Sequence, residues 1–151
     1  MRIVYLLAAS FLVGCVSTFN PTIPGESADL TILVDQSSLG SGAVVLAENF
    51  ADTSCSISSS GTRIASFSRL RTSTQSNKST HRIPATAPFI FTFYRFAGAM
   101  GLGDCKATYM FTPEPNASYT ASFSGTCSIS IRQSNDTPID DLQPVNPPCY
   151  K

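Results

Sequence analysis

The sequence predicts an all-β protein, a single antiparallel β-sandwich of seven to nine strands. Short runs of β-branched, aromatic and other apolar residues recur along the chain, and turn residues separate them at intervals of about 8–12 positions. Charged residues make up only 13% of the 151 residues, and Ser and Thr are frequent, as is typical of β-rich exported domains. The number and spacing of the runs favour an immunoglobulin-like or transthyretin-like sandwich.

The first half of the chain contains short candidate strands. Residues 30–34 and 43–47 are apolar, β-branched runs with turn residues beside them, and residues 62–71 alternate between two faces. A short strand is also expected at residues 55–57. A brief one is expected at residues 81–84, where Pro84 would end it.

The segment 89–96 predicts the central strand. Both of its faces are apolar, and fully burying one Phe side chain stabilises a fold by about 1.5–3 kcal/mol. One face carries Phe89, Phe91 and Phe93, and the other carries Ile90, Tyr94 and Phe96.

Three further strands are predicted at residues 105–112, 118–124 and 127–131. The first two are joined by a short Pro- and Asn-containing turn at residues 113–116, which predicts an antiparallel hairpin. The tail, residues 134–151, contains four prolines and three aspartates, and we expect Cys149 to attach it to the domain.

The N-terminus predicts export. Arg2 precedes an apolar run at residues 3–13, which is shorter than the roughly 20 residues that a spanning helix needs. A basic start followed by an apolar region of this length is typical of a secretory signal.

The run ends in Leu12-Val13-Gly14-Cys15, which resembles the lipobox of bacterial lipoproteins. The resemblance implies that residues 1–14 are a signal peptide and that Cys15 carries lipid. Residues 15–28 would form a flexible tether, and residues 29–151 the β-sandwich domain. No Asp follows Cys15, which favours the outer membrane, facing the periplasm. The alternative is an ordinary signal peptide in which Cys15 has no role.

The other cysteines predict structural disulfides. Four cysteines remain, an even number that allows all of them to pair: Cys55, Cys105, Cys127 and Cys149. No two of them have the C-x-x-C spacing of zinc or redox sites. The expected hairpin places Cys105 opposite about residue 125, so the favoured pairs are Cys105–Cys127 and Cys55–Cys149.

Few residues indicate chemistry. His81 is the only histidine, it lies beside Arg82, and no G-x-S-x-G motif is present. Glu48 and Asp52 are four residues apart, and nothing in the sequence places them in a cleft. We therefore expect no catalytic residue, no cofactor and no metal site. Losing Arg2 with the signal would leave nine basic and ten acidic side chains, which argues against nucleic-acid binding.

One asymmetry of charge points to a partner. Between Asp52 and Asp104 the chain contains basic but no acidic residues. One interpretation is that these basic residues protect a strand edge from aggregation. The other is that they form a basic patch that binds an acidic envelope protein or polymer. The residues are Arg63, Arg69, Arg71, Lys78, Arg82 and Arg95.

Together these observations predict a lipid-anchored cell-envelope lipoprotein that acts as a non-enzymatic binding module. Its partner would be an envelope or secretion complex, or a protein that it inhibits. A structural envelope component without a dedicated ligand and a periplasmic hydrolase are the alternatives.

Overall fold

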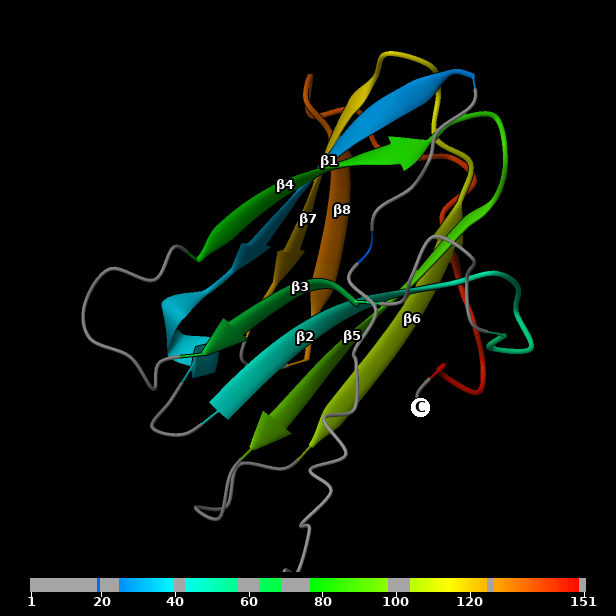
Figure 1. Cartoon of the computed structure of the whole chain (residues 1–151). Coiled ribbons are helices and arrows are strands. Elements are labelled where there is room, and N and C mark those ends of the chain that lie inside the picture. The colour runs from blue at the N-terminus through cyan, green and yellow to red at the C-terminus, as the bar shows by residue number, and fades with distance from the viewer. Residues whose placement is uncertain are drawn as a thin grey trace, which may run out of the picture.

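The computed structural model is a sandwich of two β-sheets (Figure 1). It describes residues 19, 25–39, 43–56, 63–68, 77–97, 104–124 and 127–149. Nine strands and one 3-10 helix, η1 (Gln36–Leu39), lie within these residues. In the same part of the chain, no helix is long and apolar enough to cross a membrane. The predicted β-sandwich is confirmed.

The first sheet has four strands in the order β4-β1-β7-β8. They are β4 (Lys78–Pro84), β1 (Ser27–Val34), β7 (Ser118–Phe123) and β8 (Ile129–Gln133). The β1–β4 and β7–β8 pairs are antiparallel, whereas β1 and β7 are parallel. The sandwich therefore contains one parallel pair that the predicted antiparallel arrangement lacked.

The second sheet has five strands in the order β3-β2-β5-β6-β9, and all of its pairs are antiparallel. They are β3 (Arg63–Ser68), β2 (Ala43–Phe50), β5 (Phe89–Ala97), β6 (Cys105–Phe111) and β9 (Gln143–Pro144). As predicted, β5 is an interior strand, since it lies between β2 and β6.

Aromatic rings from both sheets form the core between the layers. Phe93 of β5 stacks on Phe123 of β7 at 5.4 Å between ring centroids, and Phe111 meets Tyr119 at 5.0 Å. Fully buried rings such as these supply much of the hydrophobic stabilisation, about 1.5–3 kcal/mol each. Phe89, Phe91 and Phe93 all lie in this core, as the alternation of β5 predicts.

The other face of β5 is covered in part by the C-terminal tail. Ile90 packs with Phe50 and Cys149 in a second, smaller cluster. The amide of Cys149 donates to the hydroxyl of Thr108 at 2.7 Å. At the far end of this face, Phe96 remains 49% exposed. One face of β5 is therefore apolar because it lies in the core, and the other is apolar because the C-terminal tail covers part of it.

The predicted hairpin between residues 105–112 and 118–124 is wrong. β6 pairs with β5 and β9 in one sheet, whereas β7 pairs with β1 and β8 in the other. The intervening loop crosses from layer to layer: the carbonyl of Pro113 accepts the amide of Thr86, and the amide of Asn116 donates to the carbonyl of Ser27. A short loop with turn residues can join strands of different sheets as readily as paired ones.

Two local predictions also need correction. Cys55 and Ser56 are not in a strand, because they close a turn around Asp52. Its carboxylate accepts the amides of Ser54 and Ser56, which satisfies backbone donors that a strand would pair with a neighbour. Residues 143–144 form β9, which the sequence did not predict.

The structure contains the two disulfides that the sequence favours, Cys55–Cys149 and Cys105–Cys127, with Cα–Cα distances of 5.2 and 6.0 Å. Cys105 begins β6, and Cys127 lies just before β8, so their bond joins the two sheets. The pairing is as expected, although the hairpin that suggested it does not exist.

The folded part reaches further toward the N-terminus than residue 29. β1 begins at Ser27, and Phe19 is buried in the core cluster. The amide of Phe19 donates to the carbonyl of Arg63 at 2.8 Å, and its ring meets Phe89 edge-on at 6.2 Å. The predicted signal peptide and Cys15 lie outside the described residues.

Candidate functional site

The outer face of the four-stranded sheet is covered by hydroxyl groups. Along β1 and β7 the apolar residues point into the core, so the residues between them face outward. We call this surface the hydroxyl face; its hydroxyl-bearing residues are Thr31, Thr80, Ser118, Thr120, Ser122 and Ser130.

The strand register arranges these residues in rows across the sheet. Thr80, Thr31 and Thr120 lie opposite one another on β4, β1 and β7, and Arg132 of β8 extends the row. The hydroxyls of Thr31 and Thr80 are 3.0 Å apart. The next row contains Leu33, which lies between Lys78 of β4 and Ser122 of β7, and Ser130 of β8 extends it.

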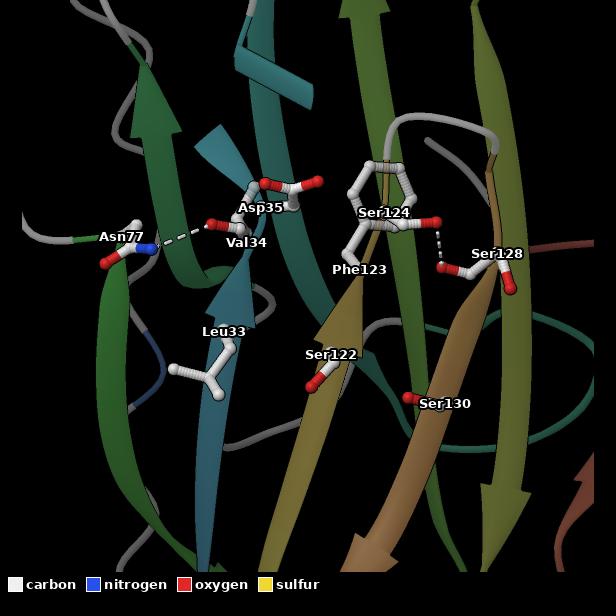
Figure 2. Close-up of a pocket in the computed structure, with 9 residues that line it drawn as sticks. All are labelled: Leu33, Val34, Asp35, Asn77, Ser122, Phe123, Ser124, Ser128 and Ser130. Carbon is white, nitrogen blue, oxygen red and sulfur yellow. Dashed lines mark hydrogen bonds between the residues drawn. The ribbon is translucent and has the colours of Figure 1, made fainter. Parts of the chain in front are cut away.

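Two adjoining hollows lie on this face. The first, of about 280 Å³, lies where β1, β7 and β8 meet the loops and includes Leu33, Asn77 and Ser128 (Figure 2). The second, of about 290 Å³, lies over β7 and β8. Both are lined by Ser122 and Ser130, so they adjoin at these residues, and we call the two hollows together the β7/β8 groove.

The first hollow has a polar rim held by hydrogen bonds. Asn77 donates through its side-chain amide to the carbonyl of Val34 at 3.2 Å, and the hydroxyl of Ser124 donates to the carbonyl of Ser128 at 3.4 Å (Figure 2). These bonds connect the ends of neighbouring strands. The hydroxyl face is therefore built on strands rather than on the loops, which favours a constant geometry.

Two arginines beside the hydroxyl face have polar partners. Arg132 and Asp136 approach to 3.6 Å at the rim of the second hollow, with 61% and 85% of their side chains exposed. Arg82 lies opposite Asp29 in the register and donates to the hydroxyl of Ser27 at 2.8 Å. An exposed pair of this kind contributes little stability, but it keeps the local charge near zero.

The structure does not support the six predicted basic residues as one exposed patch. Arg95 is only 4% exposed, because it lies on the inward side of β5. Arg63 donates to the carboxylate of Glu48 at 2.9 and 3.2 Å. Lys78 and Arg82 are in β4, an edge strand of the other sheet. Arg69 and Arg71 lie outside the described residues.

His81 lies in β4, and its Nε2 is 2.6 Å from the hydroxyl of Ser79. Burial lowers the pKa of the His81 imidazole. In the portion of the chain that is described, no carboxylate is bonded to this ring. The pair therefore has the contact of a nucleophile and a base without the third group that orients a triad.

Three acidic residues away from this face have structural contacts. Glu48 is engaged by Arg63, and Asp141 accepts the amide of Thr112 at 2.8 Å. Hydrogen bonds from Ser54 and Ser56 lower the pKa of Asp52 to about 2. Over the described ranges, no three His, Cys, Asp or Glu side chains group as a metal site would require.

No model of a known protein family matches the chain, and no curated protein matches it. Sequence reasoning missed the hydroxyl face because it followed the apolar half of each alternating strand. The signal was present in the other half, where Ser118, Thr120 and Ser122 are followed by Ser128 and Ser130.

Proposed function

We propose that this protein is a lipid-anchored lipoprotein of the cell envelope that acts as a non-enzymatic binding module. The motif Leu12-Val13-Gly14-Cys15 supports the anchor, with Cys15 as the lipidated residue. The domain would stand on the outer membrane and face the periplasm.

The single observation that supports binding is the hydroxyl face with its groove. Ser122 and Ser130 line both hollows, so this face presents hydroxyl groups to a ligand in a depression rather than on a flat surface. The hydroxyl face replaces the basic patch as the proposed contact surface, because Arg95 is buried and Arg63 is paired with Glu48.

Metabolic labelling tests the anchor. Cells expressing the wild-type chain or Cys15→Ala would be grown with a clickable palmitate analogue and then fractionated. We expect wild type to be labelled and to sediment with membranes, and Cys15→Ala to be unlabelled and released from them. Equal labelling of the two chains, or labelling of neither, would contradict the lipoprotein assignment.

A further inference from the structure

The β7/β8 groove contains hydroxyl groups that the fold itself does not use. Within the described part of the chain, no side-chain hydrogen bond involves Thr120, Ser122 or Ser130, and Figure 2 shows the last two beside the bonded Ser124–Ser128 pair. We propose that this groove binds a neutral glycan chain that lies across β7 and β8. This inference rests on the proposed function, since it names the ligand class of the binding module.

The chemistry of the groove matches a polyhydroxylated ligand. A serine or threonine hydroxyl can both donate and accept a hydrogen bond. A row of such groups is complementary to a ligand that also offers a donor and an acceptor at each position, as sugar hydroxyls do. Leu33 supplies an apolar surface at the edge of the first hollow, suited to the C–H face of a sugar ring.

The size and shape of the groove favour an extended ligand. Ligand pockets that enclose a whole small molecule usually have about 300–1,000 Å³. Each hollow here, of about 280 or 290 Å³, is at or below the lower end of that range. Because the two hollows share Ser122 and Ser130, successive units of one chain can occupy both.

The charges argue against a polyanion. Arg132 of the groove is paired with Asp136, and its neighbourhood therefore has no net positive charge. The outward-facing residues of β4, β1, β7 and β8 include no aromatic ring, because Tyr119 and Phe123 point into the core. A nucleic acid would need stacking contacts and several cations, whereas the residues that line the two hollows include one cation, Arg132, and two carboxylates, Asp35 and Asp136.

The test is direct titration of the full chain, purified in detergent, with chitohexaose, cellohexaose and maltohexaose. Isothermal titration would measure affinity, and amide chemical shifts would locate the bound sugar. We expect at least one hexasaccharide to bind and to perturb β7 and β8. Binding of chitohexaose alone would indicate that the natural ligand is an N-acetylated glycan. Binding of cellohexaose or maltohexaose would indicate an unmodified glucose chain.

Matched variants test the location. Ser122→Ala combined with Ser130→Ala removes two groove hydroxyls, and we expect it to weaken binding about tenfold. Ser66→Ala removes an exposed hydroxyl from the other sheet and should leave the affinity unchanged. Thermal unfolding would establish that both variants fold.

Three outcomes would overturn the proposal. They are absence of binding to every neutral hexasaccharide, binding that the groove variant leaves unchanged, and shifts confined to the free edge of β8. The last would indicate addition of a peptide strand. Because these measurements do not depend on Cys15, loss of glycan binding and loss of lipid labelling are separate results.

Discussion

The Cys55–Cys149 bond should be the more stabilising of the two disulfides. It spans 94 residues, whereas Cys105–Cys127 spans 22. In the chain-entropy model, closing loops of these lengths stabilises the fold by about 4.7 and about 3.4 kcal/mol. Cys149 is also fully buried, so its removal disturbs packing as well.

The comparison uses two double variants of the full chain, Cys55→Ala/Cys149→Ala and Cys105→Ala/Cys127→Ala. Equilibrium unfolding in urea would give the free energy of unfolding of each. We expect the first variant to lose about 1 kcal/mol more than the second, the difference between the two loop terms. Amide hydrogen exchange should also accelerate in this variant at Val145, a residue of the released tail whose amide donates to the carbonyl of Thr108.

A Cys105→Ala/Cys127→Ala variant that is less stable than the Cys55→Ala/Cys149→Ala variant would contradict this expectation. That result would mean that joining the sheets at the start of β6 contributes more than closing the long loop. Unchanged exchange at Val145 would show that β9 holds the tail without the disulfide.

Three further predictions concern the core and its edges. Phe19→Ala should lower the free energy of unfolding in urea by about 3 kcal/mol, because it empties a buried site; no loss would show that residue 19 is not part of the folded domain. Thr108→Val leaves the buried amide of Cys149 and the hydroxyl of Thr92 without their partner, and should cost about 1–3 kcal/mol in the same assay, more than Thr92→Val. Burial lowers the pKa of His81 in the folded state, so the unfolded chain binds the proton more tightly. The contribution of His81 to thermal stability should therefore be full above pH 6.5 and decrease as the pH falls below that value. The variant His81→Gln should flatten this dependence.

Local patterns predicted most of the strands because alternation is a local property. The segment 89–96 indicated β5 because its rings occur on both faces, and the apolar runs at residues 30–34 and 43–47 lie inside β1 and β2. What the sequence could not specify was which strands pair. The loop between β6 and β7 has the composition of a hairpin turn, and only the packing of two sheets places those strands in different layers.

The candidate site was harder to predict than the fold. The basic residues fall in one stretch of sequence, but the four that the structure describes lie on β3, β4 and β5, which belong to two different sheets, and the inward side of β5 buries Arg95. The hydroxyl face shows the reverse relation between sequence and space, since Thr80, Thr31 and Thr120 are far apart in sequence. They become neighbours through pairing of β4 and β7 with β1.

The burial of Phe19 determines how far the domain could travel from a membrane. If lipid is attached at Cys15, three residues lie between the anchor and Phe19, and the four Cα–Cα steps span about 14 Å when fully extended. A free linker from Cys15 to residue 28 would instead reach about 45 Å. The short connection would confine the hydroxyl face to a thin layer beside the bilayer. If the groove binds a glycan as proposed, only a glycan that reaches this layer could be bound.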